Sequence, residues 1–224
     1  MDRLRLLTML LATLTLGGGL VQAQQQTVEW IPTGDETIRL RLVVQNLREA
    51  TRPDGKPVLT FDGGRIRVAP EVASPFAVVI VPIGLPPESQ PTLVLRDVQE
   101  ERVPLDRFPD LLASDWKLEE TQEPIASVEP IGYLRDRYIG RVIFRPLRVE
   151  GNELQIVRSC TVEVRPSVPL RAPDPYAVPY PPSAFDELAG SFLANAPQSA
   201  SWRAGRRPVF SAAAFPRPRA VRSR

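Results

Sequence analysis

Short runs in which apolar and polar residues alternate recur along this chain, and they constrain its fold more than any other feature. Residues 28–30 and 38–44 alternate with a period of two, which is typical of strands that bury one face. Residues 76–81 form a continuous apolar run between Pro75 and Pro82 that is too short for a helix, so it indicates a strand buried on both faces. These patterns predict an all-β fold.

Turn signals separate further short runs of the same kind. Asp62-Gly63-Gly64 is a turn sequence whose residues tolerate positive φ. The stretch from residue 104 to 113 holds Pro109 and leaves room for one helical turn at 110–115. Additional strands are expected at residues 57–61, 65–68, 92–95, 138–145 and 154–165.

The clearest hairpin is expected in the second half of the chain. Residues 138–145 lead through Pro146 to a turn at 150–153, and the chain returns along residues 154–165. Alternation on the returning strand places Cys160 among inward-facing apolar residues, where a thiol stays protonated and inert. Several short strands with turns at these intervals predict an antiparallel β-sandwich.

The chain divides into five segments by composition. We expect a signal peptide over 1–23, the sandwich over 24–165, a Pro-rich linker over 166–182, an amphipathic helix over 183–196 and a disordered Arg-rich tail over 197–224. The linker holds seven prolines in seventeen residues, which favours an extended segment without a core.

The first segment has the order of a secretory signal peptide. Arg3 and Arg5 precede an apolar run over 6–20, and Ala23 ends a small-residue cleavage sequence. No second long apolar run follows, so stable membrane insertion is not expected. The predicted location is the periplasm, the outer-membrane surface or the extracellular space.

The helix after the linker carries an apolar stripe that is expected to bind a partner. Ser183 is a suitable N-cap with Asp186 three residues later. Phe185, Leu188 and Phe192 recur at helical spacing. The stripe docks either on the sandwich or on a surface that this chain does not contain.

The complete absence of histidine excludes most enzyme chemistry. A Ser-His-Asp triad, a Cys-His pair and a His-ligated zinc all need an imidazole, and the single Cys excludes disulfides and thiolate zinc sites. Neither phosphate-binding nor dinucleotide-binding glycine motifs occur, so no cofactor is expected. Acidic clusters at 100–101, 106–115 and 119–123 are interpreted as solvated loop charges.

The charge is distributed unevenly along the chain. Residues 202–224 carry seven Arg and no acid, whereas residues 24–201 have a net charge of −6, within an overall charge of +2. The predicted sandwich is therefore mildly acidic, and nucleic acid is not an expected partner of it.

Several motifs, in order along the chain, resemble the propeptides of gingipain-type cysteine peptidases. Residues 55–70 are similar to the opening "G-x-P-x-L-P … I-x-x-P" segment of those propeptides, and residues 132–147 are similar to their "G-x-x-R … v-x-i-x-P-v" segment. Residues 154–164 are similar to their closing strand, and Asn195 with Trp202-Arg203 resembles the "N … W-R" ending in relatives of the type IX secretion sortase. The positions that carry the resemblance are Gly55, Pro57, Leu59, Ile66, Pro70, Gly132, Arg135 and Pro146.

The resemblance implies an exported, non-catalytic propeptide domain that keeps a peptidase latent and helps it fold. The implied partner is the catalytic domain of a gingipain-type cysteine peptidase, and no catalytic residue can be carried over to this chain. Where such a propeptide is followed by its catalytic domain, the apolar stripe would contact that partner rather than the sandwich. Removing 183–224 is therefore expected to leave the Tm of the sandwich nearly unchanged. The Arg-rich ending departs from the family pattern and favours a truncated gene.

A different class of function is also compatible with the sandwich. Trp116, Tyr133 and Tyr138 lie in or near expected loops, and exposed aromatic rings of this kind occur in stand-alone adhesion or carbohydrate-binding modules. A carboxylate hydrolase is the third alternative, and it would require two acids to converge in one cleft.

Overall fold

The computed structural model describes residues 27–34, 36–66, 74–116, 118, 123–167, 181 and 183–202. The expected signal peptide, most of the expected linker, the tail beyond Trp202 and Pro70 lie outside these residues. The strands are β1 (Val28–Ile31), β2 (Ile38–Val43), β3 (Arg48–Thr51), β4 (Pro57–Thr60), β5 (Val79–Leu85), β6 (Gln90–Pro104), β7 (Ala126–Leu134), β8 (Arg137–Phe144), β9 (Leu147–Glu150) and β10 (Glu153–Ser167). The helical elements are η2 (Leu105–Arg107), α2 (Pro109–Leu112), α3 (Ala184–Phe192), α4 (Ala196–Ser199) and η3 (Ala200–Trp202).

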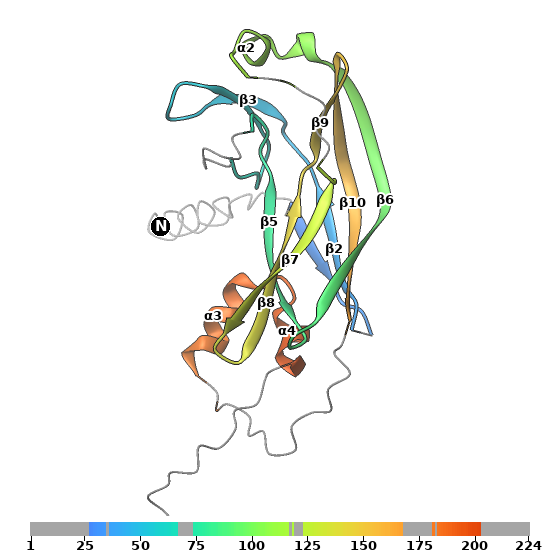
Figure 1. Cartoon of the computed structure of the whole chain (residues 1–224), viewed down its shortest axis with the longest axis vertical. Coiled ribbons are helices and arrows are strands. Elements are labelled where there is room, and N and C mark those ends of the chain that lie inside the picture. The colour runs from blue at the N-terminus through green and yellow to red at the C-terminus, as the bar shows by residue number, and fades with distance from the viewer. Residues whose placement is uncertain are drawn as a thin grey trace, which may run out of the picture.

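The strands form two main antiparallel sheets and one separate hairpin. The larger sheet has the order β1-β2-β10-β6, with β9 also paired to β10, and the smaller sheet has the order β5-β8-β7. The β3–β4 hairpin contacts the segment just before β5 through the backbone hydrogen bonds of Leu59 with Pro75 and Ala77. Figure 1 shows the two sheets as layers, with α2 at one end of the molecule and α3 and α4 at the other.

The core lies between the two sheets. In β2, Ile38, Leu40 and Leu42 are fully buried, whereas Arg39 and Arg41 between them face outward. Val142 and Phe144 from β8 belong to the same buried cluster. Burying such side chains stabilises the fold by about 1.5–3 kcal/mol each. The predicted antiparallel β-sandwich is confirmed.

Strand β10 keeps its inward face through a pair of compensating bulges. The pairing with β6 shifts by one residue on β10 after Val157 and shifts back on β6 between Gln99 and Arg96, where Asp97 has a φ of 50°. Because the two shifts cancel, the register of the sheet is restored beyond them. Cys160 therefore faces the core, as its alternation predicted.

We expect Cys160 to react slowly with thiol reagents in the folded protein. Its side chain is almost fully buried, and burial raises the pKa of the thiol to about 12, so the thiolate is nearly absent at pH 8. Labelling with an Ellman-type reagent at pH 8 should be slow in buffer and fast in denaturant. Fast labelling of the folded protein would mean that the register of β10 is shifted by one residue.

The expected hairpin at 138–165 has a different first strand from the one predicted. The two-residue turn at Gly151-Asn152 joins β9, not β8, to β10. Strand β8 belongs to the other sheet, where it pairs with β5 and β7. The chain crosses between the sheets at Pro146, which has no N–H to donate to a ladder and whose carbonyl accepts a hydrogen bond from Val157.

Three strands lie where the sequence predicted loops or shorter strands. β3 lies in the polar stretch before Lys56, and β7 occupies residues assigned no element. β6 extends far beyond the expected 92–95 and includes Glu100 and Glu101, so the prediction that these two acids lie in a loop was wrong. β6 is an edge strand whose charged side chains are solvated, which hides it from a search for apolar periodicity.

Candidate interaction surface

The first group of family-motif residues shapes the β3–β4 end of the sandwich. Gly55 is exposed in the hairpin turn with a φ of 84°, a conformation that favours glycine. Pro57 begins β4, and Leu59 is fully buried in the core. Ile66 is half-buried and packs against the same core. These residues therefore have structural roles.

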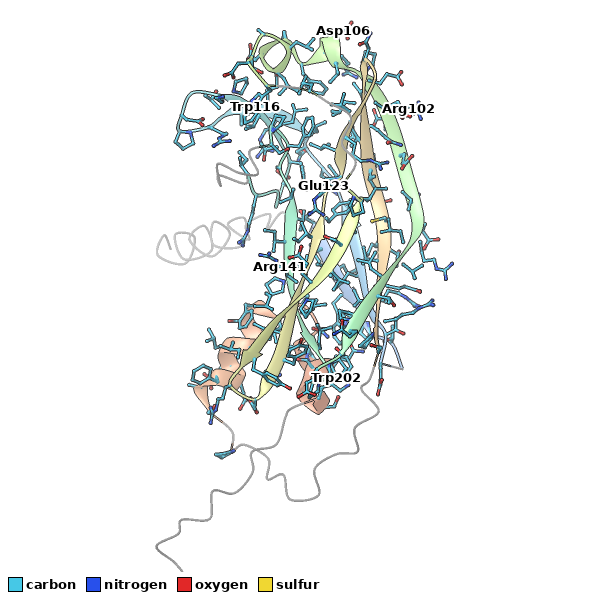
Figure 2. The ribbon with its side chains drawn as sticks, in the orientation of Figure 1. Arg102, Asp106, Trp116, Glu123, Arg141 and Trp202 are labelled. Atoms are coloured by element: carbon cyan, nitrogen blue, oxygen red, sulfur yellow. The ribbon has the colours of Figure 1, made fainter. Side chains whose placement is uncertain are left out.

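Trp116 is held against the same hairpin. Its indole Nε1 donates a hydrogen bond of 2.7 Å to the Pro57 carbonyl oxygen. Arg52 and Lys56 lie 5.7 and 4.9 Å from the ring centroid. The indole is half-buried and engaged within the protein, so it does not favour the carbohydrate platform considered from the sequence. Figure 2 shows Trp116 near the α2 end, far from Trp202.

The second group of motif residues lies in the smaller sheet and at the point where the chain leaves that sheet. Gly132 has a φ of 136° at a bulge in β7, and Arg135 has a φ of 60° in the two-residue turn between β7 and β8. Pro146 is buried at the crossing between the sheets. The motif residues therefore lie at both ends of the molecule and do not meet in one site.

Helix α3 begins where the sequence predicted and presents two sides. The Phe185 amide donates to Ser183 Oγ, and the Ser183 amide donates to Asp186 Oδ2 at 3.0 Å, which completes the capping box. Phe185 and Leu188 from the predicted stripe are exposed, while Phe192 is half-buried.

The segment that follows α3 closes the free edge of β5. The Gly84 amide donates to Asn195 Oδ1 at 2.8 Å, and Asn195 Nδ2 donates to the Gly84 carbonyl oxygen at 3.0 Å. This side chain reproduces the two hydrogen bonds that a neighbouring strand would make. The Ala194 amide also donates to the Pro82 carbonyl oxygen at 3.0 Å. Asn195 is fully buried.

Helix α4 packs so closely on β5 that only glycine fits beneath it. A Cβ atom placed on Gly84 would lie 2.2 Å from the Ser199 Cβ, well inside any real contact. Ser199 itself is buried. The glycine in β5 therefore leaves the space that α4 needs to pack on this strand.

Arg137 joins the β7–β8 hairpin to both helices. Its Nη2 donates to Asp186 Oδ1 at 3.0 Å, and its Nη1 donates to Ser199 Oγ at 3.2 Å. The Arg137 side chain is only 9% exposed. Together with Asn195, this contact makes residues 183–202 part of the folded sandwich. The expectation that their removal leaves the Tm unchanged is therefore reversed, because removal would uncover β5 and Arg137.

The outer face of the larger sheet is a network of ion pairs. Glu163 on β10 contacts the guanidinium groups of three arginines: Arg39, Arg96 and Arg165. Hydrogen bonds from Arg165 and Arg39 lower the pKa of Glu163, and burial opposes them only in part. The charged groups around Glu163 therefore pair with one another across three strands.

Three acidic residues of the clusters noted in the sequence are paired with basic residues rather than with one another. Arg158 pairs with Glu101, Lys56 pairs with Asp115, and Arg145 pairs with Glu123. Within the described ranges, no group of His, Cys, Asp or Glu is placed to hold a metal ion. None of the helices in that part of the chain is long and apolar enough to cross a membrane.

Sequence reasoning identified some of the exposed apolar side chains and missed others. It identified Phe185 and Leu188, but not the exposed Ile131 of β7. A glycine inside a strand, such as Gly132, often marks a bulge. The roles of Gly84 and Arg137 left no comparable local signal.

The two-sheet architecture is shared with solved structures of gingipain pro-domains, so this chain has their fold. One similar solved structure is the complex of Porphyromonas gingivalis RgpB pro- and mature domains, at 14% identity and a TM-score of 0.57. The similarity covers 77% of this chain and 100% of the matched chain. The resemblance predicted from the sequence motifs is confirmed at the level of the fold.

A second solved structure describes the zymogenic latency of gingipain K from Porphyromonas gingivalis. It matches at 14% identity and a TM-score of 0.50, over 66% of this chain and 96% of the matched chain. No protein-family model matches the sequence. No curated protein matches it either.

Proposed function

We propose that this chain is an exported, non-catalytic propeptide-like domain of the gingipain type. It covers the catalytic domain of a gingipain-type cysteine peptidase, keeps that domain latent and assists its folding. The observation that carries the proposal is the fold shared with the whole of the matched RgpB pro-domain chain. A rigid sandwich of this kind can occlude a cleft without undergoing chemistry itself.

The composition supports a binding role rather than a catalytic one. The chain contains no histidine, so it cannot build the Cys-His pair of the peptidase class to which it would bind. Its single cysteine is buried and protonated. Inhibition would therefore result from covered surface, and specific interfaces of this kind bury about 1,200–2,000 Å² in total.

Inhibition of a purified peptidase tests this function. The purified chain is mixed with the mature domains of RgpB or gingipain K, and hydrolysis of a chromogenic peptide is followed with time. We expect inhibition with a constant below about 1 μM, the affinity range of a specific interface of standard size. Trypsin serves as the control and should keep its full activity. Undiminished hydrolysis by both gingipains at tens of micromolar chain would overturn the proposal.

A further inference from the structure

A group of arginines covers part of the outer face of the larger sheet, where β2, β10 and β6 lie side by side (Figure 1). Its members share one face because the antiparallel register pairs them, through Thr161 and Glu163 of the central strand, across these three strands. This group, the arginine face, consists of Arg39, Arg41, Arg96 and Arg165. The alternate residues of β2 and β10 face the core, so the guanidinium groups lie on the solvent side of the sheet.

The arginine face has one acid where it would need several. Glu163 contacts Arg39 Nη2 at 2.9 Å, Arg165 Nη2 at 2.9 Å and Arg96 Nε at 3.7 Å. By contrast, Arg102 further along β6 pairs with two acids at once. One carboxylate therefore serves three guanidinium groups, and positive charge is left over at this place.

Arg41 adds to this surplus because no acid neutralises it. It is exposed and forms no ion pair within the part of the chain that the structure describes. Glu29 of β1 lies opposite Arg41 in register and is also exposed, but the two side chains are not within ion-pair distance. The face is therefore positive even when Glu29 and Glu163 are both counted. Residues 24–201 as a whole have a net charge of −6, so this positive charge is local.

Glu163 holds the guanidinium groups in place without exhausting their donors. Its side chain is 11% exposed, and its two oxygens accept hydrogen bonds of 2.9 Å from Arg39 and Arg165. A guanidinium group carries five N–H donors in a fixed plane, so most of them stay free for another acceptor. The side chains of Arg39, Arg96 and Arg165 are 39%, 54% and 52% exposed, so a ligand can reach them. Groups that are already held lose little freedom on binding.

We infer that the arginine face binds an acidic polypeptide segment in which Asp or Glu recurs at every second residue of an extended chain. The face already binds one carboxylate, that of Glu163, through charge-assisted hydrogen bonds. Arg39 and Arg41 alternate on one strand and are about 6.8 Å apart, which is also the spacing of alternate side chains in an extended segment. This inference goes beyond the proposed function and does not depend on it.

A short acidic segment fits this face better than a long polyanion. The face spans three neighbouring strands, which is about 10 Å across at the usual distance between strands. Duplex DNA carries a negative charge about every 1.7 Å along its whole length. Most of a long polyanion would therefore lie over the rest of the domain, whose net charge is negative and repels it. A segment of about eight residues is short enough to contact only the arginines and their neighbours.

Titration of the full chain with a model peptide, followed by NMR, tests the inference. The peptide has about eight residues with Glu at every second position and Ser between, and it is added to isotope-labelled protein at about 20 mM salt, where exposed charges are weakly screened. We expect amide shifts centred on Arg41, Thr161 and Glu163, and a Kd of about 1 mM or below, as for a few exposed ion pairs. The same peptide with Gln in place of Glu should cause no shifts.

Variants that remove charge from the face should weaken this binding. Arg41→Gln combined with Arg96→Gln should raise Kd about 10-fold, because a well-formed exposed ion pair contributes up to about fivefold in affinity. The matched control combines Arg48→Gln with Arg141→Gln, which removes the same charge. Those two side chains are 55% and 43% exposed, but each already pairs with an acid of its own. The control should stay within about twofold of the wild-type Kd.

Thr161→Glu is a second variant, and it removes no arginine. Thr161 lies between Arg41 and Arg96 in register, so the new carboxylate would occupy their free donors. This substitution should abolish the shifts caused by the acidic peptide. Normal binding by a folded Thr161→Glu variant would contradict the inference.

Two further outcomes would overturn the inference. One is the absence of any shift with the acidic peptide, or an equal loss of affinity in the arginine-face variant and its matched control. The other is tighter binding of heparin or single-stranded DNA than of the peptide at the same residues in the same buffer, which would assign the face to a polyanion. None of these titrations contains a peptidase, so the proposed function stands or falls separately, by the inhibition assay.

Discussion

Replacing Asn195 with alanine is expected to destabilise the sandwich by about 2–4 kcal/mol, because two buried backbone groups lose their partners at about 1–3 kcal/mol each. The groups are the amide and the carbonyl oxygen of Gly84, which bond to the Asn195 side chain at 2.8 and 3.0 Å. Helix α4 covers this position closely, with Ser199 against Gly84, so water has little room to replace the lost amide.

Equilibrium unfolding in urea measures this effect directly. Ser191→Ala is the matched control, because Ser191 lies on the exposed side of α3 and its hydroxyl bonds only to the Leu188 carbonyl oxygen within the same helix. The control should change the free energy of unfolding by less than about 0.5 kcal/mol, as surface substitutions usually do. Equal unfolding midpoints for the two variants would show that the edge of β5 does not depend on Asn195.

The strands that were predicted correctly are those whose buried residues follow a regular pattern along the sequence. β2 and β10 each bury one face, so their alternation is visible in the sequence. The apolar run at 76–81 located the start of β5, but the strand begins at Val79 and continues through Pro82 to Leu85 rather than ending before the proline. The capped start of α3 was equally visible, because Ser183 and Asp186 interact locally. Strands that bury one face, and a helix start that is set by neighbouring residues, were therefore sufficient to predict the fold class.

The sheet to which a strand belongs could not be predicted in the same way. Residues on both sides of Pro146 are apolar and buried, and β8 and β9 pair with strands of different sheets. The distinction depends on partners distant in sequence, such as Val79 opposite Phe144. Strand β6 was missed for the opposite reason, since backbone pairing with β10 holds it while its side chains stay in water.

The exposed apolar side chains were predicted only where one element carries them. The stripe of α3 was visible because Phe185 and Leu188 share a helical period, and the structure leaves both exposed. The exposure of Ile131 on β7 depends on a bulge against β8, which requires the pairing to be known. Asn195 was identified as part of a motif, but its role depends on Gly84, more than a hundred residues away.

Replacing Arg137 with alanine is expected to lower the free energy of unfolding by about 2–4 kcal/mol, near the values for breaking a buried ion pair by removing one partner. The substitution removes the hydrogen bonds to Asp186 and Ser199, which link β8 to α3 and α4. Asp186 would keep its bond from the Ser183 amide, which limits the loss. In a domain of this size, the Tm should fall by roughly 4–16 °C.

Arg141 provides a control on the same strand with a contrasting environment. It lies four residues after Arg137 and pairs with Glu129 across the strands, but its side chain is 43% exposed, against 9% for Arg137. Exposed ion pairs contribute about 0–1 kcal/mol, so Arg141→Ala should leave the Tm within a few degrees of wild type. If both variants melt together, Arg137 is not the connection that holds α3 and α4 on the sandwich.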